Sequence, residues 1–172
     1  INITNSKIIN IQNSFFLNAK MSSIIFSNEK QFQNFPYSIS NCTFYNNNAH
    51  LKNKNGGAMI AINCQLIINY SFFLNNQADL GGSIFISSHY LVVIKNNFFA
   101  DNVADQSGGA IFWEVNLPIL ISNEFVNNSA NFYGQNTASK PIKLTLINLN
   151  SDTNDNSIIN ISLYNLSQIK IC

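Results

Sequence analysis

The chain has 172 residues, of which 46% are hydrophobic and only 10% are charged, and its formal net charge is +1. All nine basic residues are lysines, and this lack of arginine argues against nucleic-acid binding and against a polybasic membrane-surface protein. No run of about 18 apolar residues is present, so no transmembrane helix is predicted. Because the sequence starts at Ile1 without a methionine or a signal peptide, we expect a mature chain or an internal fragment.

Short β-strands are predicted along the whole chain, because no segment shows a sustained apolar period of about 3.6 residues. A turn at residues 35–37 closes the first part of the chain. From residue 37 to 138, each apolar strand is followed by a recurrent motif and then by a second strand, and after Pro141 strands continue without the motif. In chain order, the predicted strands are residues 8–11, 23–26, 58–62, 66–68, 83–86, 91–94, 110–113, 143–149, 158–163 and 169–171.

The recurrent motif is F-x-x-N-x-A, a short gap and then a Gly-Gly pair. Its clearest copy runs from Phe99 to Ile111. The motif asparagines lie at positions 18, 47, 76, 102 and 128, separated by 29, 29, 26 and 26 residues, and a near-constant period in this range marks a repeat protein. The other copies are Phe44, Asn47, Ala49, Gly56 and Gly57; Phe73, Asn76, Ala78, Gly81 and Gly82; a worn copy at Phe125, Asn128, Ala130 and Gly134; and a weaker one starting at Phe15 and Asn18.

The length of the repeat selects the architecture. A coil of 26–29 residues accommodates three short strands and three turns, and each strand then pairs in parallel with its counterpart about 4.8 Å away in the next coil. Leucine-rich repeats have a similar length, but their L-x-x-L-x-L signature is missing, and propeller blades need about 40 residues. We therefore predict an all-β, single-stranded parallel β-helix of about six coils. We expect residues 1–172 to form one domain, with the clearest repeats at 37–138 and degenerate coils at 1–36 and 139–172.

Equivalent residues of a coil stack lie directly above one another. The motif asparagines are then expected to form an internal ladder, in which each amide donates to one neighbour and accepts from the other, so that buried polar groups are satisfied. The Gly-Gly pairs let the backbone turn with positive φ, and the small residues after them (Ala58, Ser83 and Ala110) keep that corner narrow. The predicted ladder is Asn47, Asn76, Asn102 and Asn128, and the predicted phenylalanine stack is Phe44, Phe73, Phe99 and Phe125.

These motifs resemble the repeats of chlamydial polymorphic outer-membrane proteins and related families. The matching part covers residues 37–138. The resemblance implies a right-handed parallel β-helix of the pectate-lyase type, secreted and displayed at cell surfaces, with adhesive roles. The same fold also carries polysaccharide lyases, hydrolases and phage tailspikes, so the fold alone does not select a function. The matching residues are Phe44 and Asn47 with Gly56 to Met59, Phe73 and Asn76 with Gly81 to Ile84, Phe99 and Asn102 with Gly108 to Ile111, and Phe125 with Asn128 for the first half of the motif only.

Two aspartates mark a candidate chemical site. Asp79 and Asp105 each lie three residues past a ladder asparagine, and His50 and Asn131 hold the same position in neighbouring coils. Carboxylates one strand spacing apart can share a proton, flank a glycosidic bond or hold Ca²⁺. An exposed turn that accepts any small polar residue explains the pattern more simply, and the adjacent coils lack a third acid, an arginine or a clear base. We therefore predict no catalytic, cofactor or metal residues, and keep Asp79 and Asp105 as a catalytic alternative.

The remaining motifs carry less information. The loop beginning at Asp152 starts like an EF-hand, but Ser157 replaces the required glycine and Leu163 the bidentate glutamate, so we reject an EF-hand. The two histidines lack metal-ligand spacing, and no nucleotide or cofactor motif occurs, so no cofactor is predicted. Trp113 suits either a sugar platform or, more simply, packing in the core.

Six N-x-S/T sequons are present, about as many as chance provides in a chain with 32 asparagines. They matter only if the protein is secreted, in which case we expect glycosylation of at least one. Asn127 is the doubtful site because it adjoins the ladder residue Asn128. The candidates are Asn2, Asn41, Asn69, Asn127, Asn160 and Asn165.

Three cysteines allow either one disulfide with one remaining thiol or three free thiols. Cys42 and Cys64 lie in consecutive segments and are the candidate pair in an oxidising compartment. A Cα–Cα distance above about 7 Å would exclude the bond. Cys172 is left to pair elsewhere.

Taken together, these patterns favour a non-enzymatic, extracellular structural or adhesive β-helix glycoprotein that takes part in a filament or surface assembly. Its partners would be other copies of itself or further coils, because both ends read as uncapped strand. A second expected contact surface is an apolar stripe on the strand after Gly-Gly, with Ile60, Phe85 and Phe112 outside and Met59, Ile84 and Ile111 inside. The alternative is a carbohydrate-active β-helix enzyme, a polysaccharide lyase or hydrolase.

Overall fold

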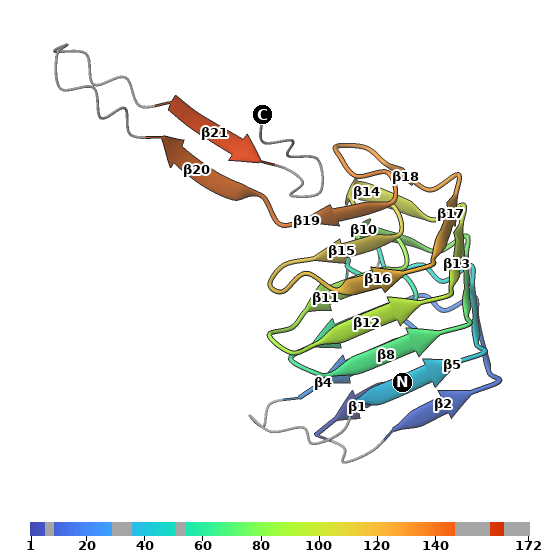
Figure 1. Cartoon of the computed structure of the whole chain (residues 1–172). Helices are drawn as coiled ribbons and strands as arrows, with labels where there is room; N and C mark the ends of the chain where they lie inside the picture. Colours follow the sequence, from blue (N-terminus) through green and yellow to red (C-terminus); the bar gives the residue numbers. More distant parts are fainter. Residues whose placement is uncertain (6–8, 29–35, 51–53, 147–158, 164–172) are drawn as a thin grey trace, which may run out of the picture.

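The computed structural model describes residues 1–5, 9–28, 36–50, 54–146 and 159–163. The regular structure of these residues is entirely β-strand, so they include no helix of the length and apolarity that crossing a membrane requires. The strands stack into a parallel β-solenoid, which confirms the predicted fold class, although it has about five turns where about six coils were predicted (Figure 1). The right-handed sense of winding stays a prediction.

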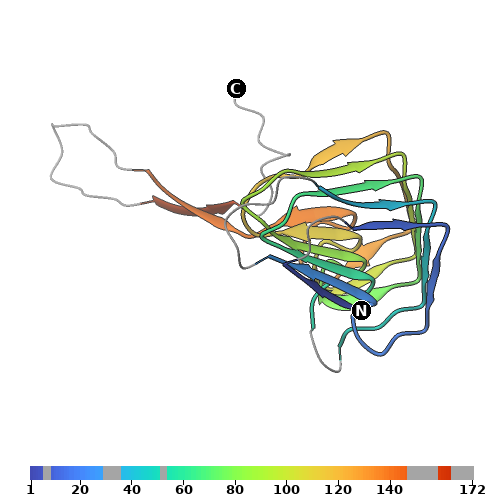
Figure 2. The same cartoon turned by 90° about the horizontal axis from the view of Figure 1, so that it is seen from below.

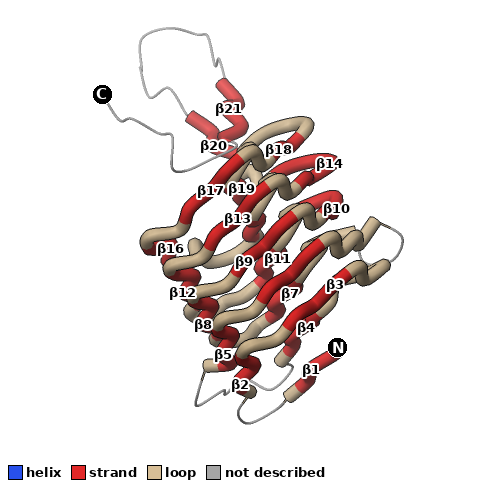
Figure 3. Tube along the Cα trace, turned by 90° about the vertical axis from the view of Figure 1, so that its right-hand side faces the viewer, coloured by secondary structure: helices blue, strands red, loops and turns tan. Residues whose placement is uncertain are grey.

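Each turn contributes one strand to each of three long parallel sheets, and successive coils run along one another (Figures 2 and 3). The first sheet is β1 (Asn2–Thr4), β4 (Ile24–Ser27), β7 (Met59–Ile62), β11 (Ile84–Ser87), β15 (Ile111–Trp113) and β19 (Thr137–Ser139). The second is β2 (Asn10–Gln12), β5 (Tyr37–Ser40), β8 (Leu66–Asn69), β12 (Val92–Lys95) and β16 (Ile119–Ile121). The third is β3 (Phe15–Leu17), β6 (Thr43–Tyr45), β9 (Phe72–Leu74), β13 (Phe98–Ala100) and β17 (Glu124–Val126). A fourth, shorter sheet is β10 (Gln77–Leu80), β14 (Val103–Ser107) and β18 (Ser129–Ala130).

The chain leaves the solenoid after β19. β20 (Ile142–Leu146) pairs with β21 (Ile159–Leu163) in the antiparallel sense, and Figure 1 draws this hairpin outside the stack. The prediction of a degenerate coil in residues 139–172 is therefore wrong for these strands, because a coil would add parallel strands to the stack. The ladder asparagine and the Gly-Gly corner are both lost after Pro141, which removes the groups that hold one coil on the next. The predicted strand at 169–171 and the loop at 152–156 lie outside the described residues.

The main core lies inside the coils and is lined by alternate residues of the three long sheets. Met59, Ile84 and Ile111 of the first sheet are fully buried, as their phase predicted. Trp113, at the end of β15, packs in the same core, so packing rather than a sugar platform is its role.

The opposite phase of the first sheet is buried as well, so the predicted exposed stripe is wrong. Phe85 and Phe112 are only 6% and 3% exposed, and their rings stack with centroids 5.9 Å apart. Together with Ile60 they belong to a second, smaller core against which Leu80 and Tyr133 pack. Each of these two covering residues immediately precedes the glycine corner of its coil. The chain's own corner segments therefore cover the outer face of the first sheet.

The predicted asparagine ladder is confirmed. Asn47, Asn76 and Asn102 are fully buried, and the side-chain amide of each donates to the side-chain oxygen of the next ladder asparagine at 2.9, 3.1 and 2.9 Å. The same oxygens accept the backbone N–H of the preceding ladder residue at 2.9–3.1 Å. The amide of Asn76 also donates to the carbonyl of Phe44, so the ladder is tied to the phenylalanine stack beside it.

The phenylalanine stack is confirmed too, with ring centroids of successive members 4.7–5.1 Å apart. The weak first copy of the motif, however, lies one residue later than predicted. Phe16, not Phe15, is the register partner of Phe44 and stacks on its ring at 4.7 Å. Ala19 therefore holds the ladder position, while Asn18 is exposed. The doublet Phe-Phe made the two registers indistinguishable by residue type.

Asparagine has a second role, at the corners of the coil. Among the residues that the structure describes, thirteen non-glycine residues have positive φ, and nine of them are asparagines. Asparagine adopts this left-handed region more readily than other residues with a Cβ. Two columns of such residues flank the third sheet: Asn13, Asn41, Tyr70, Asn96 and Ser122 before it, and Asn18, Asn46, Asn75, Asp101 and Asn127 after it.

The two glycines of each pair are needed for different reasons. Gly81 has φ of 63°, which favours glycine. Gly82 lies so close to the next coil that a Cβ on it would overlap the carbonyl oxygen of Gly109. The predicted positive φ therefore applies to the first glycine, whereas close approach between coils requires the second.

The predicted disulfide between Cys42 and Cys64 is wrong, because both thiols are free and buried. Cys42 lies at the corner between the second and third sheets, whereas Cys64 lies at the corner between the first and second. The two therefore occupy different corners of the coil. Burial raises the pKa of both thiols, that of Cys64 to about 12. Cys172 lies outside the described residues.

Candidate functional site

A surface groove of about 540 Å³ runs along the corner between the second and third sheets. Four successive coils contribute to it. Its side chains are aromatic, amide and hydroxyl groups, with Glu124 as the one charged residue of the lining. The lining residues are Asn41, Tyr70, Ser71, Phe72, Asn96, Asn97, Phe98, Ser122 and Glu124.

The aromatic side chains of the groove face outward. Tyr70 is 56% and Phe72 50% exposed, and the ring of Phe72 lies 6.1 Å from that of its register partner Phe98. Aromatic side chains provide a large contact area at a small cost in conformational entropy, and neighbouring amide and hydroxyl groups provide adaptable hydrogen bonds. The groove therefore has the composition of a binding surface.

Tyr70 is held in an unfavourable backbone conformation. Its φ is 51°, and the same corner position holds asparagine or serine in the other coils. A bulky residue in the left-handed region is an outlier that costs about 1–3 kcal/mol, and such residues cluster at binding sites. The aromatic ring at the groove is thus present at the expense of stability.

One feature of the sequence that is not part of the repeat motif indicates this groove. Phe72 and Phe98 each precede a phenylalanine of the internal stack. Neighbouring residues of a strand point to opposite faces, so one member of each Phe-Phe doublet must face outward. The curvature that turns this outer face and the adjacent corner into a groove cannot be read from the doublets.

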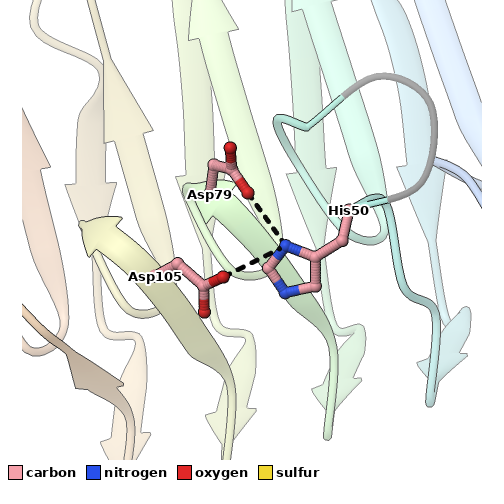
Figure 4. Close-up of side chains that lie close together, drawn as sticks. All are labelled: His50, Asp79 and Asp105. Carbon is pink, nitrogen blue, oxygen red and sulfur yellow. Dashed lines mark hydrogen bonds and ion pairs between the residues drawn. The ribbon is translucent and has the colours of Figure 1, made fainter.

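A second site lies at the fourth sheet, where Asp79 of β10 and Asp105 of β14 converge with His50 from a turn of the preceding coil (Figure 4). The Nδ1 of His50 is 2.8 Å from Oδ1 of Asp79 and 3.3 Å from Oδ2 of Asp105. The three ligand atoms lie within 4.8 Å of one another and come from three consecutive coils. The predicted column of these residues is therefore confirmed in position. Asn131 follows Ala130 at the same phase of the next coil and is exposed.

Backbone pairing and a β-bulge bring the three side chains together. Asn48 bridges to Gln77 in the next coil, which places His50 beside Asp79, and the His50 N–H donates to Oδ1 of Asn48 at 3.1 Å. Between β10 and β14 the register shifts, so that Asp105 and the residue after it stand opposite Asp79. Bulges of this kind change the direction of a side chain and are frequent beside functional sites.

The two ring nitrogens of His50 differ in their polar partners. Its Nδ1 faces two carboxylate oxygens, whereas its buried Nε2 has no hydrogen-bond partner among the described residues. The second ring nitrogen usually fixes the tautomer through its own hydrogen bond. Because the two carboxylate oxygens only accept hydrogen bonds, Nδ1 carries the ring proton toward them when no ion is bound. A cation that takes the place of this proton leaves the ring N–H on Nε2. The cluster can then act as a cation site or as an acid–base group.

The other predicted residues do not join either site. His89 is exposed and lies outside the His50 cluster. Among the sequons, Asn2, Asn41 and Asn127 are exposed and Asn69 is half-buried, so glycosylation there stays a prediction. Asn160 lies in β21, and Asn165 is outside the described residues.

Comparison with family models, with curated proteins and with solved structures gave no match to this chain.

Proposed function

We propose that the chain is a structural and adhesive β-solenoid glycoprotein of the cell surface, and that its groove binds neutral glycans. The observation that carries the proposal is the groove, where Tyr70 and Phe72 are exposed beside amide and hydroxyl groups. The resemblance of the repeats to those of polymorphic outer-membrane proteins supports an adhesive role. Membership of that repeat family is part of the proposal.

The chemistry of the lining favours a glycan. A sugar ring presents apolar C–H faces that pack on aromatic rings such as Tyr70 and Phe72, and its hydroxyls both donate and accept hydrogen bonds. The amides of Asn41 and Asn96 have the same dual capacity. The lining contains no lysine and has a single carboxylate, Glu124, so it suits a neutral rather than an anionic glycan.

The strain at Tyr70 supports a binding role for this corner. A tyrosine whose side chain is largely exposed gains little from packing, yet it occupies a position where asparagine or serine serves in the other coils. Selection for stability alone would favour asparagine or glycine at this φ. Ligand contact supplies the reason to keep the aromatic ring.

An array of neutral oligosaccharides tests the proposal. The protein should be made without N-linked glycans, because Asn41 lies both in the groove and in a sequon. We expect saturable binding that weakens at least about tenfold in Phe72→Ser, as for the loss of an aromatic anchor. The matched control is Phe15→Ser, which removes a 74% exposed phenylalanine from the same outer face outside the groove. Absence of binding, or equal loss in both variants, would contradict the proposal.

Self-association is the second part of the proposed role. The strands of the first coil, β1, β2 and β3, each have a strand neighbour on one side only within the described part of the chain. Open strand edges are ready sites for pairing with another copy of the chain or with further coils of the same chain. Sedimentation velocity over rising protein concentration should show reversible association. A monomer at every concentration would count against assembly by this edge.

A carbohydrate-active enzyme remains the alternative function, favoured by one observation. Asp79 and Asp105 lie on consecutive coils and both reach His50, so two carboxylates and a base are within one cluster. Depolymerisation of a polysaccharide by the purified protein, abolished in Asp105→Asn, would support this alternative. A broad glycan panel left intact would leave the adhesive proposal standing.

A further inference from the structure

We propose that His50, Asp79 and Asp105 form a binding site for a divalent transition-metal ion of the zinc class. The bound ion links three consecutive coils. The three ligand atoms already converge, with His50 Nδ1 2.8 and 3.3 Å from the two carboxylate oxygens. The inference concerns a different part of the solenoid from the glycan groove, whose lining contains none of these residues.

The two distances from His50 Nδ1 are close to those around a tetrahedral ion, and the two carboxylate oxygens lie within 4.8 Å of one another. Ligand atoms bound at about 2.0–2.1 Å around tetrahedral Zn²⁺ lie about 3.3 Å apart. The separation of His50 Nδ1 from the Asp105 oxygen already has this value, and the separation from the Asp79 oxygen has to open by about 0.5 Å. Three protein ligands fill three positions of the tetrahedron. The fourth position is left for water or for an external ligand.

The donor set selects the class of ion. Ca²⁺ takes six to eight oxygen ligands, whereas an imidazole with two carboxylates suits zinc and neighbouring transition metals. Two carboxylates share a single Nδ1–H at most, and no lysine of the described residues lies within ion-pair distance of them. An ion between the three atoms compensates both carboxylates at once. The buried Nε2, which has no partner among the described residues, then carries the ring proton.

The three ligand side chains are also partly exposed to solvent. The side chains of His50 and Asp79 are 21% and 23% exposed and that of Asp105 is 48% exposed, so an ion can enter from solvent. Because the ligands come from three coils, an ion that binds only the folded chain raises its stability with ion concentration.

Titration of the full chain with ZnCl₂, followed by calorimetry and thermal unfolding, tests the site. We expect the wild type to bind one equivalent of Zn²⁺ and its Tm to rise. Asp105→Asn should bind Zn²⁺ at least about 100-fold more weakly, because loss of a residue that only supports a metal ligand already lowers metal affinity by up to about 100-fold. Asp105→Asn is nearly isosteric at an exposed position, so the fold should persist, and His50→Ala should agree with it. Co²⁺ in place of Zn²⁺ should give a visible spectrum of tetrahedral coordination that both variants lose.

The matched control is His89→Ala, which removes the other histidine, exposed and outside the cluster. It should bind Zn²⁺ as the wild type does. The proposal is overturned if the wild type shows no saturable Zn²⁺ binding, if Asp105→Asn binds as tightly as the wild type, or if His89→Ala loses the site instead.

Discussion

The side-chain amide of Asn102 donates to Oδ1 of Asn128 at 2.9 Å, and the same oxygen accepts the backbone N–H of Asn102 at 3.0 Å. One asparagine thus satisfies two donors of the preceding coil. Because this geometry recurs from coil to coil, the ladder supplies hydrogen bonds at a corner where the backbone leaves the strand pairing. The buried polar column is therefore a connection between coils rather than a chemical site.

Replacing Asn102 with leucine should destabilise the fold by about 3 kcal/mol or more. The change removes the Asn102 oxygen that accepts from one side-chain N–H and the backbone N–H of Asn76, and the amide that donates to the carbonyl of Phe73. Each buried polar group left unsatisfied costs about 1–3 kcal/mol. Urea denaturation measures the loss. Asn131→Leu, at an exposed asparagine, is the control and should change stability by no more than about 0.5 kcal/mol. Equal stability of the two variants would show that the ladder contributes little.

Gly82→Ala should destabilise the protein by about 3 kcal/mol or more, because the new Cβ overlaps the carbonyl oxygen of Gly109 and the coils have to separate. Thermal unfolding of the variant measures the effect. Ser83→Ala, one residue later at a buried position without such an overlap, should cost about 1 kcal/mol. A Gly82→Ala protein as stable as this control would mean that the coils approach less closely at this corner.

The buried thiol of Cys64 makes stability depend on alkaline pH. Burial raises its pKa in the folded protein from 9.0 to about 12, so above pH 9 the unfolded chain loses the proton while the folded chain keeps it. Stability is therefore fully retained below pH 9 and declines as pH rises toward 12, by up to about 1.4 kcal/mol per pH unit. Urea denaturation between pH 8 and about 10, before most lysines and tyrosines titrate, measures the decline. Cys64→Ala should show a shallower slope, and identical slopes would refute the burial of this thiol.

The sequence predicted the parts of the fold that repeat. The spacing of Asn47, Asn76 and Asn102 was sufficient to predict coil length, the parallel stack and the internal ladder, since each depends only on periodicity. The same periodicity predicted the column of His50, Asp79 and Asp105. It did not predict that both carboxylates reach Nδ1 of the histidine, because a register shift between β10 and β14 changes how Asp105 stands opposite Asp79.

The wrong predictions concern features that depend on contacts between different segments of the chain. Phe85 and Phe112 do face away from the main core, but Leu80 and Tyr133 cover them, and strand phase carries no information about such a cover. The disulfide was wrong because consecutive segments of a coil end at different corners. The groove was missed for a related reason, since it depends on how an exposed face curves into its corner.

The binding role proposed for Tyr70 makes a prediction that separates function from stability. Tyr70→Asn introduces the residue that other coils use at this corner, so it should raise the free energy of unfolding by about 1 kcal/mol through relief of backbone strain. The same change removes an aromatic ring from the groove. A destabilised variant would show that the tyrosine is kept for packing.

The most direct test of the account is the affinity of Tyr70→Asn for the glycan that the wild-type protein binds, measured by calorimetry beside its stability. We predict that the variant is at least as stable as the wild type and binds at least about tenfold more weakly. A variant that binds with wild-type affinity would contradict the assignment of the groove as the adhesive site.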